Sequence, residues 1–213
     1  METVAPFKEV LDEIKEAGGD AFKLCFQCGL CDVVCPWNRV RQFSMRRIIR
    51  EATVGLTEID GEDIWRCTTC GKCPDRCPRG VKQIELGVSL RRVATEYEVF
   101  PASVRSARTA RASLISEGNP LQGEGKKRAD WAKGLSVKAF AEGMDVLYFV
   151  GCYLSYDPRM KKVAVATVNI LNKAGVAFGI LGDKEKCCGE SIRKTGSEEV
   201  FKSLARDNIK TFV

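Results

Sequence analysis

Two runs of four cysteines are the part of this 213-residue chain best suited to chemistry. The runs are Cys25, Cys28, Cys31, Cys35 and Cys67, Cys70, Cys73, Cys77. Each run has the spacing Cys-x2-Cys-x2-Cys-x3-Cys-Pro, which is the spacing of thiolate ligands in proteins that hold paired [4Fe-4S] clusters. We therefore predict two [4Fe-4S] clusters, whose chemistry is the transfer of single electrons.

The fourth cysteine of each run is expected to serve the cluster of the other run. Three thiolates from one tight loop can occupy three corners of a cube, whereas the fourth points away and completes the second cube. The two runs must then fold against each other. The expected ligand sets are Cys25, Cys28, Cys31 and Cys77 for the first cluster and Cys67, Cys70, Cys73 and Cys35 for the second.

Disulfide bonds and zinc are the alternative uses of these cysteines. Disulfides need cysteine pairs and an oxidising compartment, whereas the chain has 11 cysteines and its Met1-Glu2-Thr3 start does not resemble a secretory signal. Zinc would make the chain a structural interaction module, but it needs only two close pairs and leaves half of each run without a role. The chain has no histidine, which excludes Rieske centres and histidine-ligated haem from it.

Composition indicates a soluble protein of a reducing, anoxic cytoplasm. Hydrophobic residues make up 45% of the chain and charged residues 29%. No apolar stretch approaches the roughly 20 residues needed to cross a bilayer, so we expect no membrane span. A partner protein could hold the chain at the inner face of the membrane.

Positive charge is concentrated in four places. The formal charge is +6, but two clusters with their thiolates would lower it to about +2, which removes the argument for nucleic acid. The local clusters are Arg46-Arg47-Arg50, Arg91-Arg92, Arg105-Arg108-Arg111 and Lys126-Lys127-Arg128. They are interpreted either as solvated helix faces or as docking sites for an acidic redox partner.

The pattern along the chain divides it into 1–98, 99–144 and 145–213. Helical spacing of apolar residues predicts helices at 7–18, at 45–52 with Ser44 as cap and Gly55 as stop, and from Val81 to Tyr97. These helices bracket the cysteine loops, which favours an α-helical ferredoxin domain. The middle region is a connector with a helix at 101–117 and an anchoring Trp131.

The third region has the pattern of an α/β fold. Strands are predicted at 146–150 and 176–181, with a third beginning at 211–213, and helices at 158–174 and 198–209. The first helix is expected to bury Val163, Ala166, Ile170 and Leu171. Because ligand sites form at the carboxyl ends of such strands, Cys152 and the Cys187-Cys188 pair are expected to meet there. They are interpreted as ligands of an irregular cluster or as buried thiols.

The sequence resembles the heterodisulfide reductase family over nearly its whole length. The stretches Cys25-Phe26-Gln27-Cys28-Gly29-Leu30-Cys31, Trp65-Arg66-Cys67-Thr68-Thr69-Cys70 and Cys77-Pro78-Arg79-Gly80-Val81 resemble the C-type subunit of that enzyme. The stretches Gly118-Asn119-Pro120, Arg128-Ala129-Asp130-Trp131, Gly151-Cys152 and Cys187-Cys188-Gly189 resemble its B-type subunit, which carries the cysteine-rich CCG domain. A chain that joins the two is similar to the D-type subunit of the membrane-linked enzyme.

The resemblance implies a third site. In that family the CCG motif binds a noncubane [4Fe-4S] cluster that cleaves a heterodisulfide, and Cys152, Cys187 and Cys188 match the first part of the motif. The family has a further Cys-x2-Cys after these residues, so the chain resembles the front portion of a longer polypeptide. A complete noncubane cluster is expected only in the longer form.

These observations lead to one expected function and one alternative. The expected fold class is α + α/β: an α-helical ferredoxin domain with two [4Fe-4S] clusters, then part of a CCG-type α/β domain. The expected function is electron transfer in an anaerobic oxidoreductase complex whose other redox subunits are a flavoprotein, a ferredoxin-like protein or a quinone-linked membrane protein. The alternative is a catalytic subunit that reduces a disulfide at the noncubane cluster.

Overall fold

The structure is a computed structural model that describes residues 7–56, 59 and 61–212. These residues form two compact units. The first contains the described residues up to Arg105 together with Ser191–Glu198, and the second contains Ser106–Glu190 and the described residues from Glu199 onward. Within the described ranges, no helix combines the length and the apolar character that crossing a membrane requires.

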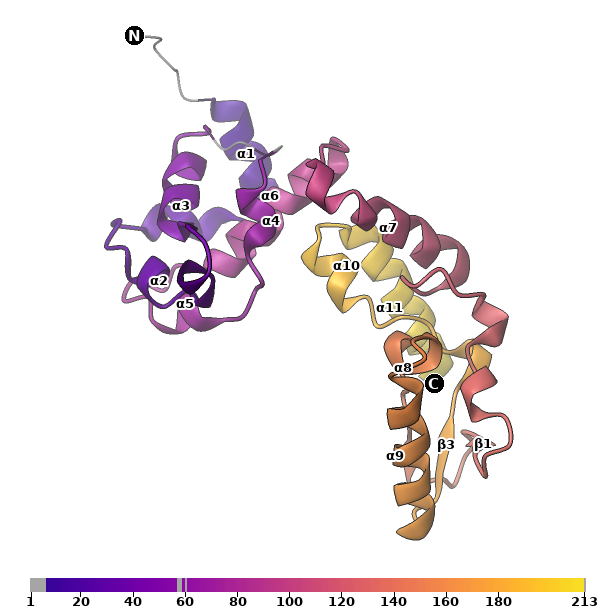
Figure 1. Cartoon of the computed structure of the whole chain (residues 1–213). Coiled ribbons are helices and arrows are strands. Elements are labelled where there is room, and N and C mark those ends of the chain that lie inside the picture. The colour runs from indigo at the N-terminus through magenta and orange to yellow at the C-terminus, as the bar shows by residue number, and fades with distance from the viewer. Residues whose placement is uncertain (1–6, 57–58, 60, 213) are drawn as a thin grey trace. The chain divides into compact units, whose positions relative to one another are not determined.

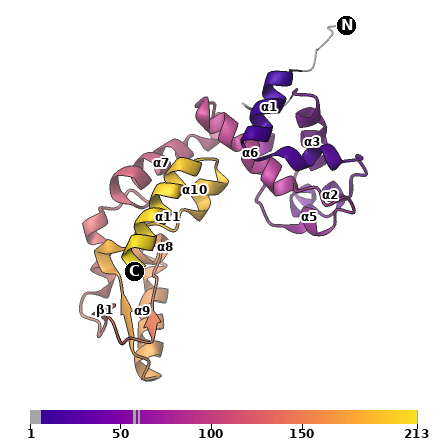
Figure 2. The same cartoon turned by 180° about the vertical axis from the view of Figure 1, so that it is seen from behind.

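The first unit is built from helices and loops (Figure 1). Its α-helices are α1 (Lys8–Glu16), α2 (Leu30–Val33), α3 (Met45–Thr53), α4 (Asp63–Arg66), α5 (Lys72–Asp75) and α6 (Gln83–Glu96). Single 3-10 turns lie at Asp20–Leu24, Pro36–Arg39 and Ala102–Val104. Helices α1, α3 and α6 pack on one another, and Figure 2 shows the same group from behind. Their shared core contains Ile14, Ile49 and Leu90, which are fully buried.

Helix α3 begins where its sequence predicts. The Ser44 hydroxyl accepts a hydrogen bond from the backbone N–H of Arg47 at 3.1 Å, which satisfies one of the free donors of the first turn. The same hydroxyl donates to Asp32 at 2.7 Å, so the cap also joins α3 to the loop that carries the first cysteine run. The predicted helices at 45–52 and 7–18 are therefore confirmed as α3 and α1.

Residues 191–198 return to the first unit and lie along α6. They include most of the short helix α10 (Glu190–Lys194). The Thr95 hydroxyl donates to the carbonyl of Thr195 at 3.0 Å, and Arg92 forms an ion pair with Glu198 at 2.8 Å. Gly196 has φ +92°, and a Cβ added there would stand 2.3 Å from the Arg91 carbonyl oxygen. This close backbone approach requires glycine.

The second unit contains a parallel sheet with helices packed against it (Figure 1). The described strands are β1 (Lys138–Ala139), β2 (Val146–Leu147) and β3 (Phe178–Ile180), in the order β1-β3-β2. Its main helices are α7 (Ser106–Glu117), α8 (Cys152–Tyr156), α9 (Lys161–Lys173) and α11 (Glu198–Phe212). Further 3-10 turns lie at Gly125–Lys127, Asp130–Ala132 and Gly182–Lys184.

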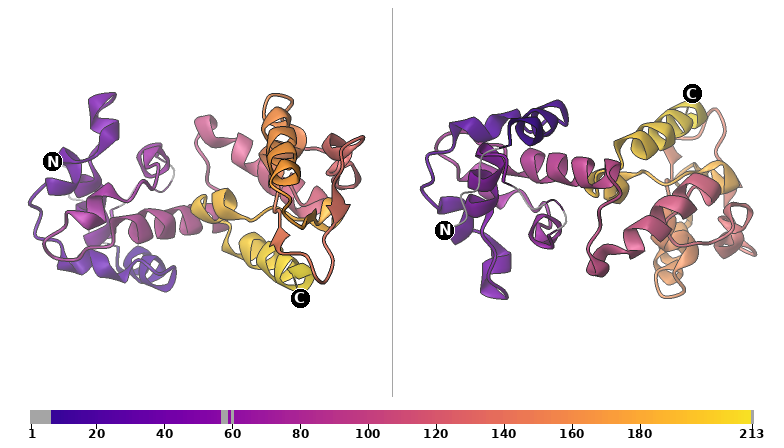
Figure 3. Two further views of the ribbon diagram at one scale, coloured as in Figure 1. Left: turned by 90° about the horizontal axis from the view of Figure 1, so that it is seen from below. Right: turned by 90° about the horizontal axis from the view of Figure 1, so that it is seen from above.

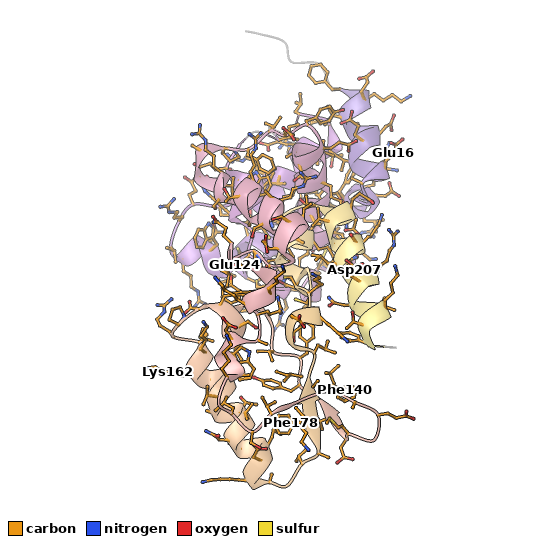
Figure 4. All side chains as sticks on the ribbon, turned by 90° about the vertical axis from the view of Figure 1, so that its right-hand side faces the viewer. Glu16, Glu124, Phe140, Lys162, Phe178 and Asp207 are labelled. Atoms are coloured by element: carbon orange, nitrogen blue, oxygen red, sulfur yellow. The ribbon has the colours of Figure 1, made fainter. Side chains whose placement is uncertain are left out.

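The core of this unit lies between α9 and the sheet. Ala164 and Val168 of α9 are fully buried and pack with Phe178 of β3 (Figure 4, where Phe178 and the outward-pointing Lys162 are labelled). Trp131 belongs to the same core and meets Tyr148 edge to face, with ring centroids 6.4 Å apart. The anchoring role expected for this tryptophan agrees with that position.

Several details of the predicted α/β pattern are wrong. The strands expected at 146–150 and 176–181 are shorter, Val146–Leu147 and Phe178–Ile180. Helix α9 turns Val163, Ala166 and Ile170 toward solvent and buries Ala164 and Val168, because the core contacts a narrower stripe of the helix than the apolar residues suggested. Leu171 is partly buried against that core. Thr211 and Phe212 do not begin a strand but complete the last turn of α11, the yellow helix of Figure 3, and Val213 lies outside the described residues.

Candidate iron-sulfur centres

The two cysteine loops share one backbone conformation. In the first, Gln27 (φ 64°) and Gly29 (φ 80°) flank Cys28, and in the second, Thr69 (φ 55°) and Gly71 (φ 87°) flank Cys70. The third cysteine of each run lies in the short helix that follows, α2 or α5. Left-handed backbone at a glutamine and a β-branched threonine is unusual, and such strain is typical of functional loops.

A small cavity contains the cysteines expected for the first cluster. It is lined by Cys25, Cys28, Cys31 and Cys77, with Gly29, Ile49, Pro78 and Val81 among its other walls. The first three cysteines come from one run and Cys77 comes from the other. The fold therefore brings the fourth cysteine of the second run to the loop of the first.

Electrostatic contacts connect the remaining cysteines of the two runs. Burial is the largest cause that raises the pKa of Cys67, and the negative charge of Cys35 raises it further. Burial likewise raises the pKa of Cys73 to about 12, with Cys67, Cys70 and Cys35 adding to the shift. Cys35 thus lies within electrostatic range of the second run.

Donors reach the sulfur atoms in both loops. The Gln27 side-chain amide donates to Cys25 Sγ, the Thr69 backbone N–H to Cys67 Sγ and the Val81 backbone N–H to Cys77 Sγ, each at 3.4 Å. Hydrogen bonds of this kind stabilise thiolate ligands and tune the potential of an iron-sulfur cluster. The loops are therefore prepared for anionic sulfur.

Two buried indole groups also suit a cluster. Trp37 follows Cys35 by two residues and Trp65 precedes Cys67 by two, and both pack against the core that contains these cysteines. Within the part of the chain that the structure describes, neither indole N–H has an acceptor, although both atoms are buried. Cluster sulfur is an acceptor that could satisfy them, so these residues fit the group that the spacing implies.

The thiols need a positive counter-charge before they can ionise together. Burial raises the pKa of Cys31 to about 12, and the charge of neighbouring Asp32 acts in the same direction. Iron supplies the missing positive charge when a cluster is bound, because a metal ion deprotonates a coordinating thiol. The burial of these cysteines is therefore compatible with thiolate ligands only in the loaded protein.

A buried arginine lies beside the second run. Arg91 of α6 is 4% exposed and donates to the carbonyl oxygens of Ile64 at 2.8 Å, Cys67 at 2.6 Å and Lys194 at 2.9 Å. Its guanidinium also lies over the Trp65 ring, 5.6 Å from the centroid. Burial lowers the pKa of Arg91, while the charge of Cys67 opposes that shift. The sequence pattern places this residue in a surface cluster and gives no sign of its role here.

The second unit brings Cys152 and Cys187 together. Cys152 begins α8 after Gly151 (φ 79°), and the side chains of Cys152 and Cys187 share a hydrogen bond. Both cysteines are buried, whereas Cys188 is exposed. The predicted meeting of Cys152 with the Cys187-Cys188 segment is therefore observed, with Cys188 directed to the surface.

A buried ion pair stands next to Cys152. Arg128 and Glu185 are each 2% exposed and pair at 2.7 Å, and the Arg128 guanidinium also donates to Cys152 Sγ at 3.4 Å. Glu185 accepts the backbone N–H groups of Val150 at 2.9 Å and Gly151 at 2.8 Å. This pair fixes the turn that carries Cys152. The sequence pattern assigns Arg128 to a basic surface cluster, and no sequence signal pairs it with Glu185.

The ion pair contributes to the ionisation of Cys152. The hydrogen bond from Cys187 is the largest cause that lowers the pKa of Cys152, to about 7, and the charge of Arg128 assists. The same hydrogen bond, together with burial, raises the pKa of Cys187. Cys152 is therefore the thiol of this pair that ionises more readily.

Comparison with known proteins accounts for both groups of cysteines. Residues 21–81 match the family of 4Fe-4S dicluster domains, and residues 146–213 match the family of cysteine-rich CCG domains. The chain joins a dicluster domain to a CCG domain. The dicluster match contains all eight cysteines of the two runs, and the CCG match contains Cys152, Cys187 and Cys188.

The relatives that the chain matches include a probable iron-sulfur-binding oxidoreductase and subunits of heterodisulfide reductases. The probable iron-sulfur-binding oxidoreductase FadF of Bacillus subtilis is 36% identical over 165 residues, which cover 72% of this chain and 23% of that protein. The D subunit of the dihydromethanophenazine:CoB–CoM heterodisulfide reductase of Methanosarcina mazei is 31% identical over 214 residues. The match covers 87% of this chain and 51% of that subunit. The C subunit of the H2:CoB–CoM heterodisulfide,ferredoxin reductase of Methanothermobacter marburgensis is 47% identical over 81 residues. The match covers 37% of this chain and 44% of that subunit.

The chain therefore spans about a quarter to a half of the length of these relatives. The resemblance to heterodisulfide reductase stated from its motifs is confirmed, as is its assignment as an iron-sulfur protein with [4Fe-4S] clusters.

Proposed function

We propose that this dicluster-CCG chain relays single electrons within an oxidoreductase complex through two [4Fe-4S] clusters. The observation that carries the proposal is the cavity lined by three cysteines of the first run and Cys77 of the second. Such a set spans four corners of one cube and leaves Cys35 for the other. The chemistry that the clusters supply is one-electron reduction and oxidation, and the protein positions, shields and tunes them.

Specific ligand sets follow from this proposal. The first cluster is held by Cys25, Cys28, Cys31 and Cys77, and the second by Cys67, Cys70, Cys73 and Cys35. The electrostatic contact of Cys35 with Cys67 and Cys73 supports the second set. Cys152, Cys187 and Cys188 are proposed as part of a third, noncubane site in a longer polypeptide.

The partners of the chain are proposed to be other redox subunits. Those relatives that are named as heterodisulfide reductase subunits belong to multi-subunit enzymes. By analogy, this chain would accept electrons from one protein or carrier and pass them to another, at the cytoplasmic side of the cell. A partner could also associate the complex with a membrane.

Exchange of the fourth cysteines tests the crossed ligation. The anaerobically purified chain should contain about eight iron and eight sulfide, as two cubanes require. Cys77→Ser should give the same low-temperature EPR change as Cys28→Ser, because both remove ligands of the first cluster. Cys35→Ser should give the same EPR change as Cys70→Ser, because both remove ligands of the second cluster.

Cys188→Ser is the control for that comparison, because Cys188 is exposed and lies outside both runs. It should leave both cubane signals intact. A Cys77→Ser spectrum that matches Cys70→Ser would show that each run serves its own cluster. Zinc without sulfide in the wild-type chain would overturn the function itself.

A further inference from the structure

A basic cavity lies on the first unit beside the first cysteine loop. Its volume is about 610 Å³. It is lined by Gln27, Gln42, Phe43, Ser44, Arg46, Arg47, Arg50, Asp63 and Arg66. Among these described lining residues, four arginines face a single carboxylate. The lining of the cavity itself is therefore basic.

The carboxylates nearby compensate only part of that charge. Asp63 is shared between Arg47 and Arg66, which pairs with it at 2.6 Å. Arg47 also pairs with Glu51 at 3.5 Å and Arg66 with Glu62 at 3.0 Å. The Arg46 guanidinium forms a long ion pair with Asp32, at 3.9 Å. That carboxylate is already engaged by the Ser44 hydroxyl and the backbone N–H of Arg46. The side chain of Arg50 is exposed and forms no ion pair with a residue that the structure describes. Among the residues that the structure describes, Arg50 therefore has the least compensated charge of the four arginines, and Arg46 keeps only a long ion pair.

The basic cavity and the proposed first cluster share a wall. Gln27 and Arg46 line both the basic cavity and the small cavity that contains Cys25, Cys28, Cys31 and Cys77. The Gln27 side chain donates to Cys25 Sγ, so one residue separates an anion in the basic cavity from a ligand sulfur. A partner held by these arginines would lie close to the first cluster.

Exposed apolar side chains surround the same loop. Phe26 is 58% exposed and Val33 81% exposed, and Leu24 and Leu30 are also exposed. Cys28, between them in sequence, is exposed as well. Apolar contact around an accessible cofactor, with charged residues at its side, is the composition expected of a transient protein interface.

We propose that this face, formed by Phe26, Leu30, Arg46 and Arg50, docks an acidic one-electron carrier protein that exchanges electrons with the first cluster. The inference rests on the proposed function and names a partner class for it. In the step, the reduced carrier loses one electron and the first cluster gains it, with no proton or covalent bond transferred. The arginines steer the carrier and orient it, which raises the association rate at low salt.

The other basic clusters suit this role less well. Arg91 and Arg128 are buried and bind groups of their own chain. Arg111 is exposed on α7, where no cysteine of either run lies. Arg46, Arg47 and Arg50, in contrast, line the cavity beside the first cysteine loop.

Stopped-flow reduction by a small acidic flavodoxin tests the proposal. The cluster-loaded full chain is mixed with the flavodoxin hydroquinone, whose flavin absorbance reports the loss of its electron. The wild-type second-order rate constant should fall as salt is raised. Arg50→Glu should lower that constant at least tenfold at low ionic strength and weaken its salt dependence. Arg111→Glu carries the same change of net charge and should alter the rate less than twofold.

A second measurement separates docking from cluster function. Dithionite should reduce both clusters of wild type, Arg50→Glu and Arg111→Glu to the same extent, as judged by EPR. Equal slowing by the two variants would overturn the docking surface, as would a wild-type rate that does not depend on salt. Loss of dithionite-reducible clusters in the wild type would instead overturn the proposed function.

Discussion

At the scale of single residues, the Arg128–Glu185 ion pair of the second unit is almost fully buried and depends on both of its partners. Two charges are held at 2% exposure, and Glu185 also accepts the N–H groups of Val150 and Gly151. Such a pair costs desolvation energy, so removing one partner is worse than removing both charges. The pair lies beside Cys152 Sγ, to which Arg128 donates a hydrogen bond that helps to lower the pKa of this cysteine.

Removing Arg128 alone should destabilise the protein more than removing both charges of the pair. Arg128→Met should lower the free energy of unfolding by about 3 to 5 kcal/mol, because the Glu185 carboxylate is left buried without a counter-ion. Arg128→Met combined with Glu185→Gln should recover part of the loss, since no buried charge remains and the amide oxygen can still accept one of the two backbone N–H groups. Anaerobic urea unfolding measures both. Lys127→Met is the control, since Lys127 is exposed and should leave stability unchanged.

Residue types and spacing were enough to predict the cysteine centres, but not the charged groups around them. The eight cysteines stand out because their spacing has few other uses. Arg91 and Arg128 belong to basic stretches of sequence, and such residues are usually exposed on the surface. The carbonyl and carboxylate groups that bind them come from distant parts of the chain. Such pairing depends on tertiary structure, and local pattern holds no information about it.

At the scale of elements, the helices were predicted best where an apolar stripe and a cap coincide. Helix α3 has both, with Ser44 before it and Ile48, Ile49 and Ala52 inward. The strands were predicted too long, because an apolar run such as Val146–Val150 does not reveal where ladder pairing ends. Only Val146 and Leu147 of that run pair with β3. The two-residue β1 has no apolar pattern at all and was missed.

Two glycines offer a matched test of backbone conformation. A Cβ added at Gly71 or Gly87 would meet nothing within 4 Å, but only Gly71, in the second cysteine loop, has a positive φ, +87°. Gly71→Ala should destabilise the protein by about 1 kcal/mol through left-handed strain. Gly87→Ala, inside α6, should stabilise it by roughly 0.5 to 1 kcal/mol through helix propensity. Anaerobic urea unfolding compares them, and equal losses would point to packing instead of φ.

At the scale of the whole molecule, Arg91 joins segments that are far apart in the sequence. Its guanidinium donates to the carbonyls of Ile64 in α4, of Cys67 and of Lys194, which lies 103 positions later in the chain. No carboxylate among the described residues is hydrogen-bonded to this buried cation. The proposed second cluster, which is anionic with its thiolates, is a group that can balance its charge.

Substitution of Arg91 should therefore distinguish the effect of its hydrogen bonds from the effect of its positive charge. Lysine cannot reach three carbonyls with a planar fork, so Arg91→Lys and Arg91→Met should both loosen residues 191–198, seen as faster amide hydrogen exchange in that segment. Only Arg91→Met removes the positive charge, so only it should lower the midpoint potential of the second cluster, by about 59 mV or more, a tenfold change for one electron. EPR-monitored redox titration should find the first cluster unchanged in both variants. If Arg91→Lys lowered the second potential as far as Arg91→Met does, hydrogen bonding to the ligand loop, and not charge, would set that potential.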